Sequence, residues 1–144
     1  EAFDNNAVAV HHLAVACREV DALLVHFSTN FVFGGDREYG IPLSESDPVK
    51  PESVYAASKL AGEHLLQIVG GRFYIVRTSG LYGGAGCREV GSSFVEKVLN
   101  LVAKGEPLEI VNDQHISPTA ALDLASKVGP DLAPSIRENS RAAS

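Results

Sequence analysis

The 144-residue sequence contains no methionine and no tryptophan, and it has only two cysteines, Cys17 and Cys87. Their wide separation has neither the spacing of a metal site nor the density of a disulfide framework. We therefore expect reduced thiols and a cytoplasmic location. No apolar run approaches the ~18 residues that a transmembrane helix requires.

Positive charge is scarce as well. Twelve Lys and Arg residues stand against eighteen Asp and Glu residues, which gives a net charge of -6. An acidic balance argues against nucleic acid or an anionic membrane surface as the main partner. The composition is that of an ordinary globular protein, with 45% apolar and 21% charged residues. The length of the chain corresponds to one domain.

Helical and extended patterns alternate along the chain. Apolar periodicity and apolar runs predict helices over about 5–20, 53–69, 92–105 and 119–128 and strands over 22–28, 72–79 and 108–111. This alternation is typical of a parallel sheet flanked by helices. Residues 129–144 contain few large apolar side chains, so we expect a disordered tail there.

The segment SVYAASKLAGEH, residues 53–64, carries Tyr55 and Lys59 four residues apart, on one face of the predicted helix. A free tyrosine has a pKa of about 10, and a nearby ammonium favours its phenolate form and makes proton transfer efficient nearer neutral pH. Carbonyl reduction needs such a pair: a nicotinamide gives hydride to carbon, and the phenol gives a proton to oxygen. The spacing alone is common, and a surface tyrosine beside a solvated lysine is the alternative interpretation.

The context of this pair favours a ligand site. Ser28 and Thr29 close the strand predicted at 22–28, and open parallel sheets bind ligands at the carboxyl ends of their strands. A hydroxyl there can hydrogen-bond the substrate oxygen that Tyr55 protonates. The segment 34–51 that follows is rich in Gly and Pro and has no periodicity, and loops of this length are often functional.

Four segments together resemble the extended short-chain dehydrogenase/reductase family and, within it, the dTDP-4-dehydrorhamnose reductases. They are FSTNFVFGG, PLSESDPVKPESVYAASKLAGE, VRTSGLYG and DQHISPTAALDLA. The resemblance covers about residues 3–128 and implies that they form the catalytic part of a Rossmann-like doubly wound α/β fold. Because the chain starts without Met and mid-sheet in this pattern, we expect the N-terminal strands and the glycine-rich phosphate turn in about 60–90 residues before Glu1.

The resemblance also implies roles for individual residues. Tyr55 would be the catalytic acid/base, Lys59 would bind the nicotinamide ribose, and Thr29 would assist with its hydroxyl. NADPH or NADH would be the cofactor, bound through Tyr55 and Lys59. The substrate would be a nucleotide-linked 4-keto sugar contacted by Thr29, Asn30 and Gly80, and the assembly would be a homodimer.

Positions next to these residues separate reactions within the superfamily. Sugar-nucleotide dehydratases usually follow the threonine with an Asp-Glu pair, whereas Thr29 is followed by Asn30 and Phe31, which favours plain reduction. The reductases usually have Asp at position 30, a bulky aromatic at Gly80 and Gly at Ile116. Two alternatives stay open: a non-catalytic regulatory or binding subunit of the same fold, and a sugar-nucleotide epimerase.

Some patterns have simpler interpretations. GLYGGAG, residues 80–86, matches a dinucleotide fingerprint, but it does not open the first helix of a βαβ unit, so we expect a turn near the substrate. His11 and His12 are adjacent and would point ~100° apart on a helix, so we expect no metal site. Glu63, four residues after Lys59, is a candidate for a helix-surface ion pair.

Overall fold

The computed structural model describes residues 1–35, 40–83, 94–109 and 117–129. The chain divides into two units, residues 1–78 and 79–144, and each is described by itself. Within the described residues, no helix combines the length and the apolar character that crossing a membrane requires.

The first unit is a βαβ unit preceded by a helix. A π-helical turn, η1 (Asp4–Val8), runs into α1 (Ala9–Glu19), and β1 (Leu23–Thr29) follows and ends in the 3-10 helix η2 (Asn30–Phe33). Helix α2 (Val54–Val69) then leads to β2 (Arg72–Thr78). The two helices and two strands predicted here are confirmed to within three residues at each boundary.

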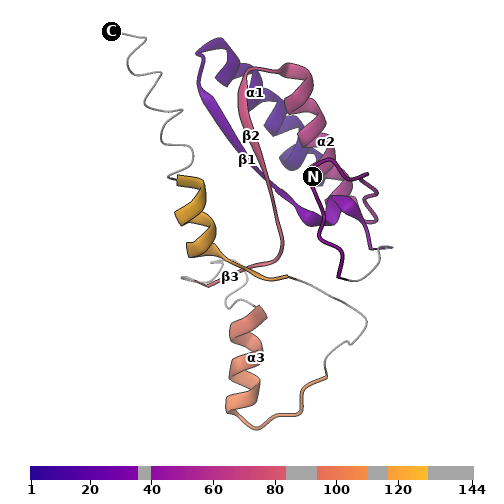
Figure 1. Cartoon of the computed structure of the whole chain (residues 1–144), viewed down its shortest axis with the longest axis vertical. Coiled ribbons are helices and arrows are strands. Elements are labelled where there is room, and N and C mark those ends of the chain that lie inside the picture. Colours follow the sequence, from indigo (N-terminus) through magenta and orange to yellow (C-terminus); the bar gives the residue numbers. More distant parts are fainter. Residues whose placement is uncertain (36–39, 84–93, 110–116, 130–144) are drawn as a thin grey trace. The chain divides into compact units, whose positions relative to one another are not determined.

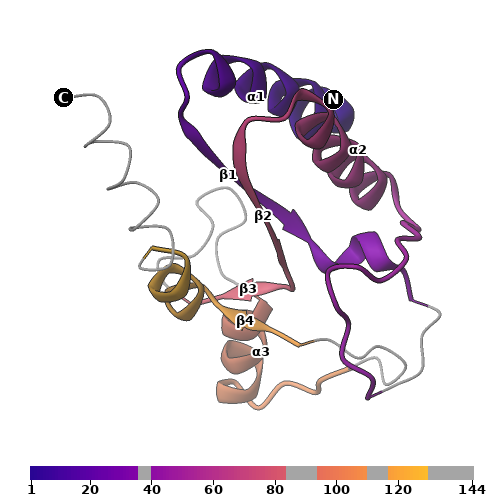
Figure 2. The same cartoon turned by 45° about the horizontal axis from the view of Figure 1, so that its top comes forward.

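Strands β1 and β2 pair in parallel, in register from Leu23 opposite Arg72 to Thr29 opposite Thr78. Helices α1 and α2 lie together on one face of this pair in both views (Figure 1, Figure 2). The parallel sheet with covering helices agrees with the predicted Rossmann-like class. Because β1 and β2 run the same way, α2 must return antiparallel to them, and its first turn lies at the carboxyl end of β1.

The core of this unit joins apolar residues of α1 and α2. Val10 and Ala14 pack on Leu66 of α2, and apolar residues of the strands close the cluster. Phe3, ahead of η1, lies outside this cluster and is 47% exposed. Removing apolar area of this kind from water contributes roughly 25 cal/mol per Å².

Local signals explain the limits of α2. The side chain of Ser53 accepts a 3.1 Å hydrogen bond from the backbone N–H of Ala56, as the N-cap of a helix does. Gly70 ends the helix with a φ of 72°, a left-handed conformation that glycine adopts without steric cost. Both ends agree with the boundaries predicted from the sequence.

The second unit contains α3 (Phe94–Ala103), a helix over residues 121–129 and two short strands that the sequence pattern did not predict. These strands, β3 (Leu81–Tyr82) and β4 (Thr119–Ala120), pair in parallel. The strand predicted at 108–111 is wrong where it can be compared, because residues 108 and 109 are not extended in a sheet, and its other half lies outside the described residues. Residue 129 is still helical, and the rest of the expected tail also lies outside them.

Candidate active site

Helix α2 carries the pair that the sequence singled out. Tyr55 lies in its first turn and is 48% exposed, and Lys59 follows one turn later and is partly buried. The ammonium of Lys59 donates a 2.5 Å hydrogen bond to the backbone oxygen of Phe27 in β1. Burial lowers the pKa of Lys59 below its ordinary value of 10.5, and the carboxylate of Glu63 opposes that shift. The amine is thus held in place at the strand rather than left free in solvent.

Thr29 is the last residue of β1 and is almost completely buried. Its hydroxyl oxygen accepts a 3.2 Å hydrogen bond from the backbone N–H of Phe31 and so caps η2. A hydroxyl that accepts one bond still has its own hydrogen to donate. The next side chain, Asn30, has a buried Oδ1 atom without a hydrogen-bond partner among the described residues.

The predicted residues of the first unit therefore come together at one edge. Lys59 reaches Phe27, which is two residues before Thr29 in the same strand, and Tyr55 lies one turn nearer the start of α2. This is the carboxyl edge of the parallel pair, where open sheets bind their ligands. Tyr55, Lys59 and Thr29 therefore lie on the elements that meet at this edge, α2 and β1.

Gly80 belongs to the second unit, so the structure does not relate it to this edge. It is exposed, and its backbone oxygen accepts a 3.0 Å hydrogen bond from the N–H of Thr119 next to the β3–β4 pair. In the segment GLYGGAG, Leu81 and Tyr82 form β3, while residues 84–86 lie outside the described residues.

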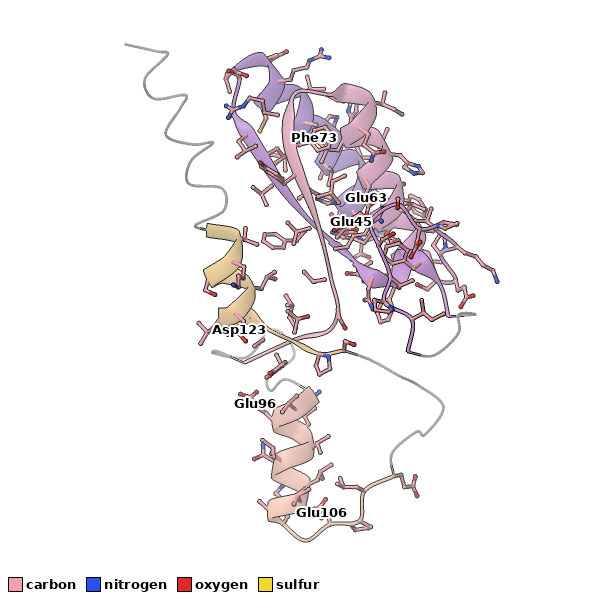
Figure 3. The ribbon with its side chains drawn as sticks, in the orientation of Figure 1. Glu45, Glu63, Phe73, Glu96, Glu106 and Asp123 are labelled. Carbon is pink, nitrogen blue, oxygen red and sulfur yellow. The ribbon has the colours of Figure 1, made fainter. Side chains whose placement is uncertain are left out.

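A buried charge cluster lies beside the predicted site, and sequence reasoning missed it. Glu63 is 0% exposed and binds Arg77 of β2, with 2.6 Å between Oε2 and Nη2. The hydroxyl of Ser28 donates a short hydrogen bond to the same carboxylate. The predicted surface pair of Glu63 with Lys59 is thus wrong in kind, since the carboxylate points into the protein. Figure 3 shows Glu63 on α2 beside Glu45 of the preceding loop.

A helical repeat was the available signal for this cluster. Lys59, Glu63 and Leu66 follow one another at spacings of four and three, so a helix that turns Lys59 and Leu66 toward the sheet also turns Glu63 toward it. Arg77 stands near the end of the strand predicted at 72–79. Neither position alone reveals a buried ion pair.

His26 is a second buried titratable group, in the middle of β1. The residue is 8% exposed, and its Nε2 atom has no hydrogen-bond partner among the described residues. Burial lowers the pKa of His26 below 6.5, the nearby Lys59 lowers it further, and Glu63 opposes both effects. The imidazole is therefore held neutral under α2.

A polar chain ties the first helical turn to α2. The side-chain amide of Asn6 donates a 3.0 Å hydrogen bond to the hydroxyl of Ser58, which donates a 2.8 Å bond to the backbone oxygen of Tyr55. Ser58 is completely buried. These bonds satisfy polar groups inside the helix contact and fix the turn that carries Tyr55.

Fold and site define an α/β protein of Rossmann-like class whose crossover helix carries a Tyr-x-x-x-Lys pair. The chain belongs to the RmlD substrate binding domain family, whose model matches residues 1–142. It is 40% identical over 124 residues to a dTDP-4-dehydrorhamnose reductase of Streptomyces griseus. The aligned region covers 85% of this chain and 38% of that protein. The enzyme of the same name from Escherichia coli K12 is 39% identical over 120 residues, 83% of this chain and 38% of that protein.

A solved structure gives the same likeness in three dimensions. The dTDP-4-dehydrorhamnose reductase of Bacillus anthracis, crystallised in complex with NADP, superposes with a TM-score of 0.78 at 37% identity. The likeness covers 89% of this chain and 43% of that one. The chain therefore spans about two fifths of the length of the relatives it matches.

Proposed function

We propose that this protein is an NADPH-dependent reductase of a nucleotide-linked 4-keto sugar, acting in the synthesis of dTDP-rhamnose. The observation that carries the proposal is the bond from Lys59 to Phe27, which holds the helix of Tyr55 against the end of the strand that carries Thr29. The matched relatives are named for this reduction and support the choice of substrate class.

The ammonium of Lys59 fits the ribose of a nicotinamide cofactor. An ammonium has three donors, and the described contacts use one of them, on Phe27. The other donors are suited to the hydroxyls of a ribose at the carboxyl edge of the sheet. NADPH, when bound, supplies the hydride, and NADH is the second candidate.

Residues of this protein supply the proton and orient the substrate carbonyl. The phenol of Tyr55 gives its proton to the carbonyl oxygen as that oxygen gains negative charge. The hydroxyl of Thr29 donates a hydrogen bond to the same carbonyl oxygen. Its hydrogen is available for this bond, since the cap of η2 uses only the hydroxyl oxygen as an acceptor.

Asn30 directly follows Thr29 at this edge and extends the proposed sugar site by its side-chain amide. For Gly80, in the second unit, contact with the sugar stays a separate proposal that rests on the family resemblance, since the structure does not relate the two units. We also propose that the protein works in the cytoplasm as a homodimer, which sedimentation velocity tests separately.

The test is the oxidation of NADPH by the purified protein, expressed from its whole gene, with dTDP-4-dehydrorhamnose as substrate. Loss of NADPH absorbance together with formation of the 4-hydroxy sugar is the expected result. A non-catalytic subunit of the same fold would bind the nucleotide sugar without consuming NADPH or NADH. An epimerase would interconvert nucleotide sugars with no net oxidation of the cofactor, and either outcome overturns the proposal.

A further inference from the structure

The guanidinium of Arg77, at the carboxyl end of β2, contacts three different segments. Its Nε atom donates to both carboxylate oxygens of Glu63 at 3.1 and 3.2 Å, and Nη2 donates to Oε2 at 2.6 Å. Its Nη1 atom donates to the backbone oxygen of Glu45 at 3.2 Å. Its Cζ atom lies over the ring of Phe33, 4.8 Å from the ring centroid. One side chain thus joins helix α2, the loop and η2.

Glu63 is the fixed base of this arrangement. It is fully buried, and the hydroxyl of Ser28 in β1 bonds the same carboxylate. A buried carboxylate that accepts bidentate hydrogen bonds from an arginine and one more from a hydroxyl has few alternative conformations of similar energy. The direction of the Arg77 guanidinium is therefore set by α2 and the two strands.

Besides Glu63, Arg77 also contacts the loop between η2 and α2, which contains Glu45. The loop follows η2 at the carboxyl end of β1, and its segment 40–48 has no regular secondary structure. The N–H of Ser44 donates to the carboxylate of Asp47 at 2.9 Å, and the N–H of Asp47 donates to the oxygen of Ser44 at 3.2 Å. The hydroxyls of Ser44 and Ser46 are hydrogen-bonded at 3.1 Å, and further along the loop the N–H of Lys50 donates to the oxygen of Val32 in η2 at 2.8 Å. The Glu45 carbonyl, one residue beyond Ser44, is where Arg77 attaches this segment to the sheet.

We propose that Arg77 is a positioning residue: Glu63 fixes its guanidinium, and its remaining donor and planar face hold the loop at Glu45 and Phe33 beside the carboxyl end of β1, where the sugar nucleotide binds. The last clause rests on the function proposed above. The anchoring of the loop rests only on the contacts of Arg77.

Arg77→Lys is the variant that separates anchoring from charge. A lysine keeps a positive charge opposite Glu63, but one ammonium has no rigid fork and no planar face with which to reach Glu45 and Phe33 as well. Hydrogen exchange of the ligand-free protein, expressed from its whole gene, measures the result. The hydrogen-bonded amides of Ser44 and Asp47 should exchange about tenfold faster, as expected on losing a charge-assisted bond.

The rest of the first unit provides the comparison. Amides of α2 should exchange within about twofold of the wild-type rate, because the loop opens without them. Unchanged exchange in the loop, or the same acceleration throughout α2, overturns the anchoring role. Glu52→Gln is the matched control, since this exposed carboxylate of the same loop pairs only at the surface, 3.7 Å from Lys50, and its loss should leave exchange at Ser44 unchanged.

A double variant covers the case in which Arg77→Lys folds poorly. Glu63→Leu combined with Arg77→Met replaces the buried pair by apolar side chains of similar size, a change that proteins often tolerate. It should fold, as judged by wild-type exchange in α1, and lose the protection of the loop. Wild-type protection of Ser44 and Asp47 in the folded double variant overturns the proposal.

Steady-state kinetics tests the link to substrate. In Arg77→Lys the KM for the 4-keto sugar nucleotide should rise about tenfold, while kcat stays within about threefold and the Kd of NADPH stays unchanged. A fall in kcat at an unchanged KM overturns the substrate-positioning role. If the wild-type protein reduces no 4-keto sugar, the proposed function fails, and the exchange experiment still decides whether Arg77 anchors the loop.

Discussion

The backbone oxygen of Asn6 lies against the α-carbon of Gly62, in the space that any β-carbon at that position would occupy. The two helical segments that meet here, η1 and α2, approach so closely because residue 62 has no side chain. Gly62 is buried, and His26 lies nearby on the strand side.

Gly62→Ala should therefore destabilise the protein although alanine is the better helix former. The added methyl group must push η1 away from α2, and overpacking of this kind costs about 1–3 kcal/mol. Urea unfolding of the two proteins measures the change. Gly70→Ala is no suitable control because of its positive φ, but Ala57→Gly in the same helix should cost only about 1 kcal/mol. A Gly62→Ala variant as stable as wild type would mean that the contact is loose in solution.

Tyr55→Phe removes a single oxygen from a half-exposed ring. Stability should change little, whereas turnover of the 4-keto sugar should fall by about 10²–10⁴-fold, the usual worth of general acid catalysis. Tyr74→Phe, at a position of β2 with 44% exposure, is the matched control and should keep wild-type turnover. If Tyr55→Phe retains more than about a third of wild-type turnover, Tyr55 is only part of a helix face.

Lys59→Met should weaken the binding of the cofactor. It removes the ammonium that bonds Phe27 and is proposed to bind the ribose, so the Kd of NADPH should rise about tenfold or more. Titration with NADPH measures the change in Kd. An unchanged Kd would remove Lys59 from the cofactor site.

Thr29→Val tests a residue with two uses. It removes the cap of η2, which should cost about 1 kcal/mol, and the hydroxyl proposed to bind the substrate oxygen, which should lower kcat by about tenfold. Thr29→Ser keeps the hydroxyl and should retain most of both. Unfolding in urea and steady-state kinetics separate the effects. Equal kcat in the valine and serine variants would rule out a role in the reaction.

Protonation of His26 should make the protein less stable in mild acid. Its pKa is lowered in the folded state, chiefly by burial, so between that pKa and about 6.5 the unfolded chain binds more protons. The free energy of unfolding should therefore fall as the pH drops through about 6.5 and level off below the folded pKa. The charged groups that face His26 are Lys59, which lowers its pKa, and Glu63, which raises it.

His26→Gln should remove this part of the pH dependence. Urea unfolding at a series of pH values measures the slope for the variant and for the wild type. His64→Gln, at an exposed position of α2, is the matched control and should keep the wild-type slope. An identical slope in His26→Gln would assign the acid sensitivity to other groups.

The sequence by itself determined the two long helices and the two strands of the first unit, and it singled out Tyr55, Lys59 and Thr29 for the proposed site. Ser53 and Gly70 mark the two ends of α2. They do so through a hydrogen bond and a dihedral angle that depend only on neighbouring residues, so the local sequence pattern was enough to predict both ends. The pairing of Tyr55 with Lys59 on one face follows from helix periodicity alone. That Thr29 ends its strand follows from the length of an apolar run.

Only the tertiary structure decided which partners these residues have. Glu63 reads as a surface residue in sequence, and it is buried because Arg77, 14 positions later, lies beside it once β2 pairs with β1. The short strands β3 and β4 were missed because each has two residues, and only the pairing of Leu81 with Thr119 makes them strands. Contacts between distant segments depend on how the elements pack, and no local pattern carries that information.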